Sequence, residues 1–309
     1  MKIVFMGTPD FAVPCLESLI NSKHTVLGVF TQPDKPRGRK QILTPPDVKV
    51  CALKHELNVY QPATLKDGKA LEIIKKLSPD VIIVVAYGKI LPEEILTYPK
   101  YGCINVHGSL LPRYRGAAPI QWSVLNGDKE TGVTTMLMEK GLDTGDILLQ
   151  ESISIGENDT SEDMYEKLAP LGAKLLLKTL DDIENNKIVP QKQDDSLSNY
   201  ASMLDKSMCE LDFSQPAQLV HNKVRGLYSW PVALTYLGSK KLKIFKTRVC
   251  DKCGNPGEII SLNPFTVACG NKSVEIIDVQ LEGKKRMDSK SFIMGYNIKC
   301  GNKLGKQDL

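Results

Sequence analysis

The sequence lacks any apolar run long enough to form a membrane-spanning helix. Its longest aliphatic run is Val81–Ala86, whereas a helix that crosses a bilayer needs about 20 apolar residues. Near residue 1, the apolar run is cut off by Gly-Thr-Pro-Asp at positions 7–10, so it is shorter than the core of a secretory signal peptide. We therefore expect a cytoplasmic protein that does not associate with a membrane.

Several catalytic and nucleotide-binding motifs are also missing. The turn after the first predicted strand reads Met-Gly-Thr-Pro-Asp-Phe and places Pro9 where a dinucleotide-binding loop needs glycine. The sequence contains no Walker motif, no Gly-x-Ser-x-Gly and no His-Glu-x-x-His. A classical dinucleotide site, a phosphate-binding P-loop, a serine hydrolase elbow and a zinc protease helix are therefore excluded.

Paired cysteines are scarce. Of eight cysteines, only Cys250 and Cys253 form a Cys-x-x-Cys pair, and no second pair follows that would complete a zinc knuckle. The pair is compatible with half of a metal site or with small apolar residues beside strands. With no export signal, we expect reduced thiols, no disulfide framework and no metal.

Length and composition predict two globular domains. The 309 residues are 42% hydrophobic and 25% charged, and single cores seldom grow beyond about 250–300 residues. Strands and helices alternate through residues 1–190, and the uninterrupted Val81–Val85 is typical of a central parallel strand. We predict a Rossmann-like α/β domain over 1–190 and a linker over 191–207. Short β-prone segments then predict a smaller C-terminal β domain over 208–309. An OB-like β-barrel would suit its basic charge, and a generic β domain is equally allowed by the pattern.

Positive charge is concentrated in the C-terminal part. Residues 206–309 hold 17 Lys and Arg against 9 Asp and Glu, whereas residues 1–205 hold 23 against 27. A basic domain attracts polyanions such as nucleic acids, although solubility alone also explains many basic domains. A second basic cluster, Lys35–Lys40, contains Pro and Gly, so we expect it on an exposed loop.

Candidate catalytic residues follow a buried strand. In Cys103–His107, alternation places Asn105 and His107 on the same face at the carboxyl end of the strand, where open α/β sheets bind ligands. Asp143, between glycines in a predicted turn, is suited to orient an imidazole and stabilise its charged form. The other histidines are expected to be structural: His24, His55 and His221.

These residues lie within longer motifs that carry a family resemblance. Asn-x-His (105–107) is followed by Gly-Ser-Leu-Leu-Pro-Arg-Tyr-Arg-Gly (108–116) and, later, by Leu-Asp-Thr-Gly-Asp (142–146). The combination resembles the active-site signature of the 10-formyltetrahydrofolate-dependent formyltransferases. Met-Gly-Thr-Pro-Asp-Phe-Ala (6–12) and Pro-Asp-Lys-Pro-Arg-Gly-Arg (33–39) extend the resemblance.

The resemblance implies a catalytic triad of Asn105, His107 and Asp143, with 10-formyltetrahydrofolate as formyl donor and no metal. It implies that the acceptor is the amino group of methionyl initiator tRNA, whose formylation serves translation initiation. The pterin end of folate would lie near Ala86–Leu91. Further folate contacts are implied for Ser109, Leu110, Leu111 and Pro112.

The resemblance also assigns a shared partner to both basic regions. It implies tRNA contacts by Arg37, Arg39 and Lys40, with Arg39 at the position of the family's key arginine, and by the C-terminal OB-like domain. We expect a monomer. Two alternatives stay open: the same chemistry on another amine acceptor, such as a nucleotide or an amino sugar, and a non-catalytic RNA-binding protein. The pair Cys250-x-x-Cys253 departs from the family pattern.

Overall fold

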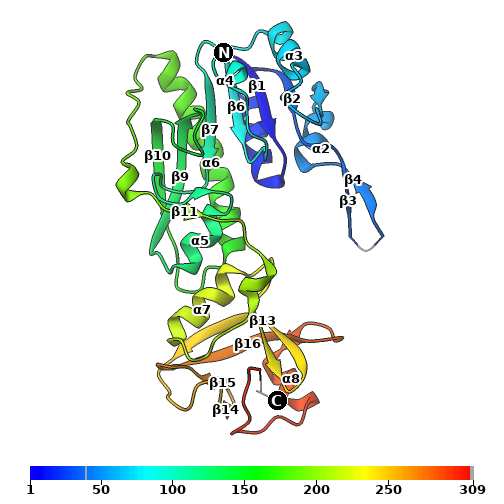
Figure 1. Cartoon of the computed structure of the whole chain (residues 1–309), viewed down its shortest axis with the longest axis vertical. Helices are drawn as coiled ribbons and strands as arrows, with labels where there is room; N and C mark the ends of the chain where they lie inside the picture. The colour runs from blue at the N-terminus through cyan, green and yellow to red at the C-terminus, as the bar shows by residue number, and fades with distance from the viewer. Residues whose placement is uncertain (39, 307–309) are drawn as a thin grey trace. The chain divides into compact units, whose positions relative to one another are not determined.

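The computed structural model describes residues 1–38 and 40–306, which form two compact units (Figure 1). The first unit comprises Met1–Gly116, Gly132–Ile153 and Tyr165–Tyr200. The second unit contains the C-terminal part together with two segments from earlier in the chain, namely Ala117–Thr131, Ser154–Met164 and Ala201–Leu309. Each unit has its own hydrophobic core.

The first unit is built on a seven-stranded sheet. In sheet order its strands are β10 (Ile147–Ser154), β9 (Glu130–Leu137), β7 (Cys103–His107), β6 (Val81–Val85), β1 (Lys2–Gly7), β2 (Thr25–Phe30) and β5 (Val59–Tyr60). The five strands from β7 to β5 are parallel, and β9 runs antiparallel to β7. From β1 the chain builds outward to β2 and β5 and then returns to the other side of β1 with β6. This reversal of strand order creates the switch point at which α/β sheets bind ligands.

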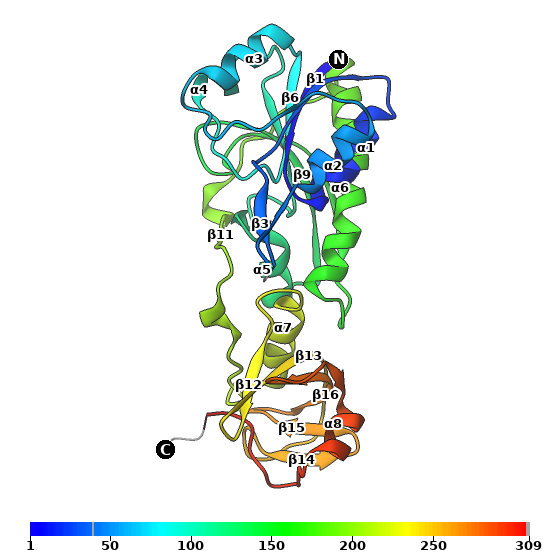
Figure 2. The ribbon, with the colours of Figure 1, turned by 90° about the vertical axis from the view of Figure 1, so that its right-hand side faces the viewer.

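Helices cover both faces of this sheet. They are η1 (Asp10–Ala12), α1 (Val13–Ile20), α2 (Asp47–Lys54), α3 (Lys69–Leu77), α4 (Glu93–Leu96) and α6 (Ser161–Glu184), which begins in a segment of the second unit. Figure 2 shows α3 and α4 on one side of the sheet and α1, α2 and α6 on the other. Because both faces are covered, every residue of β6 is buried, as the uninterrupted apolar sequence Val81–Val85 predicts.

A short hairpin follows β2. Its strands, β3 (Lys35–Arg37) and β4 (Ile42–Thr44), pair with each other and with no other strand in the described ranges. The sequence analysis expected an irregular exposed loop here. Pro36 has no amide proton to donate, so it excludes a central strand but permits this isolated two-stranded ladder.

The second unit is an antiparallel sheet with three helices. In order, its strands are β12 (Leu234–Leu237), β13 (Lys240–Cys250), β16 (Ser273–Leu281), β15 (Phe265–Ala268) and β14 (Ile259–Leu262), and β17 (Met287–Asp288) also pairs with β16. Its helices are α5 (Pro119–Leu125), α7 (Ala217–Gly226) and α8 (Ser289–Gly295). Alternate residues of β13, such as Leu242 and Ile244, join Val220 of α7 and Phe292 of α8 in one core.

Three small elements lie between α6 and α7 in the described chain, namely η2 (Asp195–Leu197), β11 (Tyr200–Ala201) and η3 (Lys206–Cys209). β11 pairs with β8 (Arg115–Gly116), which follows β7, in a two-stranded ladder. The predicted fold class, a Rossmann-like domain followed by a smaller C-terminal β domain, is confirmed; the antiparallel sheet forms a half-barrel. The predicted boundaries at 190 and 208 stay a prediction. No helix in the described part of the chain is both long and apolar enough to cross a membrane.

Candidate active site

The strand that carries the first two candidate residues lies between a parallel and an antiparallel neighbour. β7 pairs with β6 on one side and with β9 on the other, so its backbone position is fixed from both sides. Asn105 is half-buried, and His107, the last residue of the strand, is only 6% exposed. Both lie at the carboxyl edge of the sheet, where the sequence analysis placed them.

Asp143 joins them from the turn between β9 and β10. Its Oδ1 accepts a hydrogen bond of 3.5 Å from Asn105 Nδ2, and its Oδ2 lies 3.8 Å from His107 Nδ1. The same Oδ2 accepts a hydrogen bond of 2.8 Å from the Gly116 amide. One carboxylate therefore contacts both candidate side chains and the end of the loop that follows β7.

The second nitrogen of His107 is held by that loop. His107 Nε2 lies 2.8 Å from the carbonyl oxygen of Tyr114. A carbonyl oxygen only accepts hydrogen bonds, so Nε2 carries a proton in this arrangement. In the neutral ring Nδ1 then carries no proton, and it is the nitrogen that faces Asp143.

Residues far along the chain support this arrangement, and the sequence analysis missed them. Asn199 Oδ1 accepts a hydrogen bond from the Tyr114 amide. Gln193 Nε2 donates to the carbonyls of Asp143 and Gly145, at 2.8 Å each, while its Oε1 accepts from the Arg115 guanidinium. Asn199 and Gln193 lie in the segment predicted to be a linker, and no local sequence pattern connects them to residues about 50 to 85 positions away.

Three residues at this edge have strained backbones. Ala86, Tyr114 and Asp143 all have positive φ angles, of 45°, 61° and 53°. Residues other than glycine adopt this region at a steric cost, and such conformations persist where the surrounding contacts hold them. Ala86 directly follows β6, beside β7, so all three strained residues lie at the ends of neighbouring strands or in the loops that leave them.

The predicted folate segment is fixed to the neighbouring strands. Thr134 Oγ1 of β9 donates to the Ser109 carbonyl and accepts from the Leu111 amide, and Gln150 of β10 donates to the Leu111 carbonyl. The side chains of Ser109 and Leu111 are buried, whereas those of Leu110 and Pro112 are partly exposed. This segment therefore offers two accessible side chains on a rigid backbone.

The predicted pterin segment is anchored at the switch point of the sheet. Thr8, which follows β1, donates through Oγ1 to the Tyr87 carbonyl. Gln32, which follows β2, donates through Nε2 to the carbonyls of Tyr87 and Gly88. Side chains from the ends of two neighbouring strands thus hold the start of Ala86–Leu91 in place.

The structure describes two of the three residues that are predicted to contact tRNA. Arg37 is the last residue of β3, and Lys40 is exposed in the turn that follows. Arg39 lies outside the described residues.

Comparison with protein families relates both parts of the chain to one family. Residues 1–180 match the family described as formyl transferase, and residues 203–297 match its C-terminal domain. The chain belongs to the formyl transferase family. It is 49% identical over its full length to a methionyl-tRNA formyltransferase of Citrifermentans bemidjiense, 98% of which is covered. It is also 50% identical over 98% of its length to one of Pelobacter propionicus, 96% of which is covered.

Solved structures of formyl transferases share the fold. An N-formyltransferase of Helicobacter canadensis, in complex with folinic acid and dTDP-3-aminofucose, matches with a TM-score of 0.69 at 22% identity and covers 89% of this chain and 99% of its own. A glycinamide ribonucleotide transformylase of Symbiobacterium toebii covers 63% of this chain and 94% of its own, with a TM-score of 0.53 at 18% identity. At these identities the likeness extends to the fold alone.

Proposed function

We propose that this formyl transferase moves the formyl group of 10-formyltetrahydrofolate to the α-amino group of methionyl-tRNA, which yields formylmethionyl-tRNA for translation initiation. The proposal rests on the convergence of Asn105, His107 and Asp143 in a chain that matches methionyl-tRNA formyltransferases from end to end. The relatives support the proposed acceptor. The family resemblance carries the catalytic assignments, and the geometry of the three side chains supports them.

The reaction replaces one carbon–nitrogen bond with another. The neutral amine attacks the formyl carbon, whose oxygen becomes an oxyanion, and the bond to N10 of the folate then breaks. In our proposal the Asn105 amide donates to that oxyanion. Asn105 Nδ2 is suited to this task because the Asp143 carboxylate orients it before charge develops, and a preorganised donor costs no reorganisation at the moment of reaction.

His107 moves the proton in this mechanism. The attacking amine gives up a proton and N10 of the leaving folate gains one. Nδ1 of His107 accepts the proton, which forms an imidazolium between the Tyr114 carbonyl and the Asp143 carboxylate, and then passes it to N10. Burial of His107 strengthens the attraction between the imidazolium and Asp143.

Folate binds, in this proposal, along the carboxyl edge of β6 and β7. The pterin lies against Ala86–Leu91, and the formyl-bearing end lies against the segment Ser109–Pro112. Within that segment the partly exposed Leu110 and Pro112 supply side-chain contacts, while the buried Ser109 and Leu111 fix the backbone.

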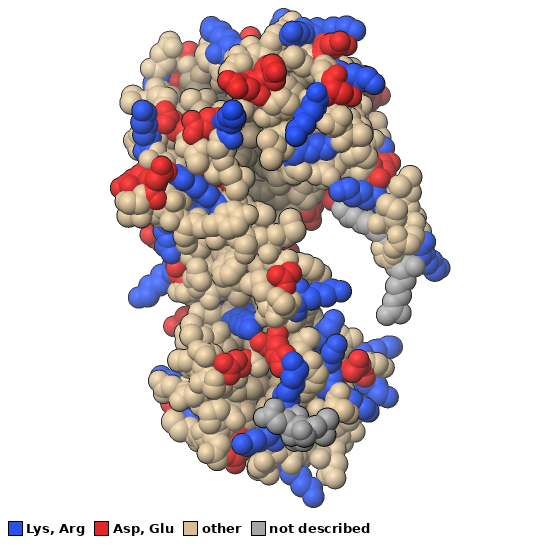
Figure 3. Space-filling view, viewed as in Figure 1, with Lys and Arg blue, Asp and Glu red and all other residues tan. Residues whose placement is uncertain are grey.

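The tRNA binds through two basic regions. One is the basic segment 35–40, whose sequence contains Arg37, Arg39 and Lys40. The other is the solvent face of β13, which we call the basic face, and in which alternate residues are exposed; Figure 3 shows Lys and Arg side chains gathered on one side of the second unit. The members of the basic face are Lys241, Lys243, Lys246 and Arg248.

Parallel assays of acceptors test the proposal. The full chain is offered 10-formyltetrahydrofolate together with methionyl initiator tRNA, methionyl elongator tRNA, glycinamide ribonucleotide or an amino-sugar nucleotide, and His107→Ala serves as the control. We expect transfer to methionyl initiator tRNA that the control abolishes. Transfer only to a nucleotide or sugar would contradict the assigned acceptor, and transfer to none would contradict the assigned reaction.

We further propose that the chain works in the cytoplasm as a monomer. Sedimentation of the purified full chain tests the oligomeric state. A single species with the mass of one chain is the expected result, and a concentration-independent dimer would contradict it.

A further inference from the structure

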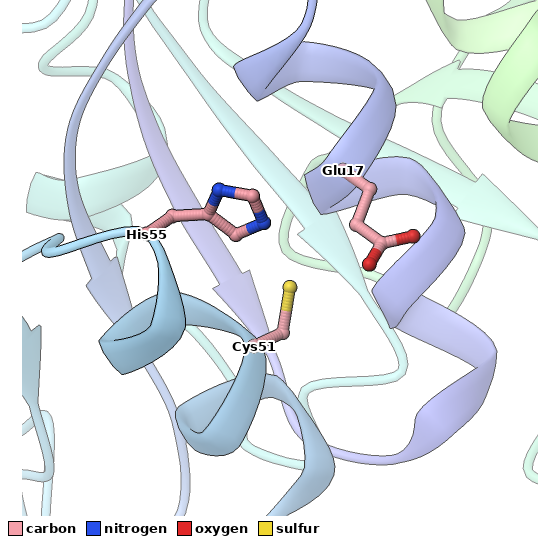
Figure 4. Close-up of side chains that lie close together, drawn as sticks. All are labelled: Glu17, Cys51 and His55. Carbon is pink, nitrogen blue, oxygen red and sulfur yellow. The ribbon is translucent and has the colours of Figure 1, made fainter.

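Three metal-ligating side chains meet between α1 and α2, far along the chain from the catalytic signature. They are Glu17 of α1, Cys51 of α2 and His55, which directly follows the last residue of α2. Cys51 and His55 are four positions apart, so they lie on the same side of the end of the helix. Figure 4 shows all three side chains pointing into the same space between the helices.

The geometry fits a divalent cation. The carboxylate oxygen, the thiol sulfur and the imidazole nitrogen all lie within 4.8 Å of one another. Tetrahedral zinc, with bonds of about 2.0–2.3 Å, holds its ligand atoms roughly 3.3–3.8 Å apart. The exposed Glu17 side chain is flexible, so rotation about its bonds brings its carboxylate closer to the other two ligands.

None of the three side chains makes a hydrogen bond or an ion pair with another residue within residues 1–38 and 40–306. No hydrogen bond or ion pair involves the Glu17 carboxylate, the Cys51 thiol or the His55 ring. Cys51 is only 7% exposed.

We propose that Glu17, Cys51 and His55 form a Zn²⁺ site that joins α1 to α2. Thiolate and imidazole ligands together favour zinc over the harder cations magnesium and calcium. On binding, Zn²⁺ replaces the thiol proton, which is released to solvent, and a water completes the four-coordinate shell. The sequence analysis expected no metal and a structural His55, because residues on two helices share no local motif.

Cobalt binding tests the site in the untagged, metal-stripped full chain. Co²⁺ bound to a thiolate produces a sulfur-to-metal charge-transfer band in the near ultraviolet. We expect one Co²⁺ per chain with this band, displaced by Zn²⁺, and no band in Cys51→Ser. The double variant Cys250→Ser with Cys253→Ser controls for the other cysteine pair and should keep the band. No band in the wild type, or a band lost only in the double variant, would overturn the proposal.

Single-ligand variants and thermal unfolding give a second readout. His55→Ala and Glu17→Gln should weaken Zn²⁺ binding at least about 100-fold, because even residues that only orient a ligand contribute about 10- to 100-fold. Glu56→Gln removes the same charge one residue beyond His55, and it should leave the affinity for Zn²⁺ unchanged. Zn²⁺ should raise the melting temperature of the wild type and not that of Cys51→Ser. An equal rise in both, or equal weakening by Glu17→Gln and Glu56→Gln, would contradict the site.

Discussion

At the residue scale, Asp143 links the parts of the candidate active site. Its carboxylate touches Asn105, His107 and the Gly116 amide. Its backbone has a positive φ, and Gln193 donates one hydrogen bond to the Asp143 carbonyl and another to the Gly145 carbonyl. In this strained conformation, the Asp143 carboxylate faces Asn105, His107 and the Gly116 amide. A substitution at any of these positions acts on the same group of contacts, so we expect their effects on the rate to be non-additive.

Replacing Asn105 with alanine removes the proposed oxyanion donor. We expect Asn105→Ala to lower kcat for formyl transfer by about 100- to 1000-fold, the usual loss for one such donor, with little change in folate affinity. Steady-state kinetics and folate binding measure the two effects separately. Asn58→Ala, an exposed asparagine before β5, is the matched control. A loss below about tenfold would refute the role of Asn105.

The residues of the site differ in how far the sequence predicted them. Asn105 and His107 follow from strand alternation, because two residues of one strand share a face wherever the strand lies. Asp143 was reached through its glycine-flanked turn and the family resemblance. The supporting contacts of Gln193 and Asn199 depend on how distant segments pack, which single-sequence patterns do not encode.

At the element scale, β13 separates core from charge by an alternation that a register shift between Ile244 and Thr247 interrupts. Leu242, Ile244 and Thr247 face the core, whereas the basic face points to solvent. The helix α8 packs through Phe292 against the same core, so it covers the opposite side of the sheet. The charged face of β13 therefore follows from the strand's period of two on each side of the register shift, which brings Lys246 and Arg248 to the same face as Lys241 and Lys243.

Removing charge from the basic face should weaken tRNA binding in a salt-dependent manner. We expect Lys243→Ala with Lys246→Ala to lower tRNA affinity and to reduce the slope of log affinity against log salt by about 2, one for each lost phosphate contact. Filter binding across a salt series measures both. The matched control is Lys290→Ala with Lys299→Ala, on and after α8. Equal slopes for the two double variants would contradict a specific role of this face.

The buried His221 of α7 should make stability depend on pH. Its Nε2 donates to the Glu157 carbonyl and its Nδ1 accepts from Thr247 Oγ1, so the neutral ring is satisfied at both nitrogens. Burial lowers the pKa of His221 from the usual 6.5, and the nearby Arg225 adds to the effect.

Because the unfolded chain binds this proton more readily than the folded chain, the contribution of His221 to stability is complete above about pH 6.5 and decreases as the pH falls below it. Chemical unfolding of the full chain at a series of pH values measures the decline. We expect His221→Gln to unfold more easily at pH 7.5 and to show a shallower loss towards pH 5. A slope identical to that of the wild type would show that His221 does not contribute.

Most elements were predictable because their patterns are local. The uninterrupted run of β6 and the alternation of β7 and β13 each identify a strand without knowledge of its neighbours. The hairpin β3–β4 was not predicted, because its three-residue strands contain Pro36 and lie outside the main sheet. The short helix α8 was also missed, since its boundaries depend on the Asp288 carboxylate that accepts from the Ser291 amide.

At the scale of the whole molecule, the two units are interleaved along the chain. Segments Ala117–Thr131 and Ser154–Met164 lie within the first 190 residues but belong to the second unit. Leu125 of α5 packs so closely on α7 that a Cβ at Gly226 would lie 2.6 Å from its Cγ. Changes in composition along the sequence show where a polar linker lies. They do not show that α5, which comes early in the chain, packs in the second unit.

This interleaving predicts how a truncated chain behaves. A fragment of residues 1–200 keeps α5 but loses its partners, including the Ser202 carbonyl that accepts from Trp122 Nε1 and the apolar Leu204 and Leu227. We expect the Trp122 fluorescence of this fragment to shift to the red and α5 to be cut by proteases. Full-length Trp230→Phe, in which Trp122 is the sole tryptophan, is the reference. Identical spectra and equal protease resistance would contradict the division into these units.

The most direct test of the account is the rate of formyl transfer by Asp143→Asn in a single turnover. The substitution keeps the shape of the side chain but removes the charge that faces His107 and orients Asn105. We predict a rate at least about 100-fold lower than that of the wild type at unchanged folate affinity, while Asp146→Asn, in the same turn, retains the wild-type rate. Equal rates for Asp143→Asn and the wild type would contradict the central claim that these three side chains carry out the transfer.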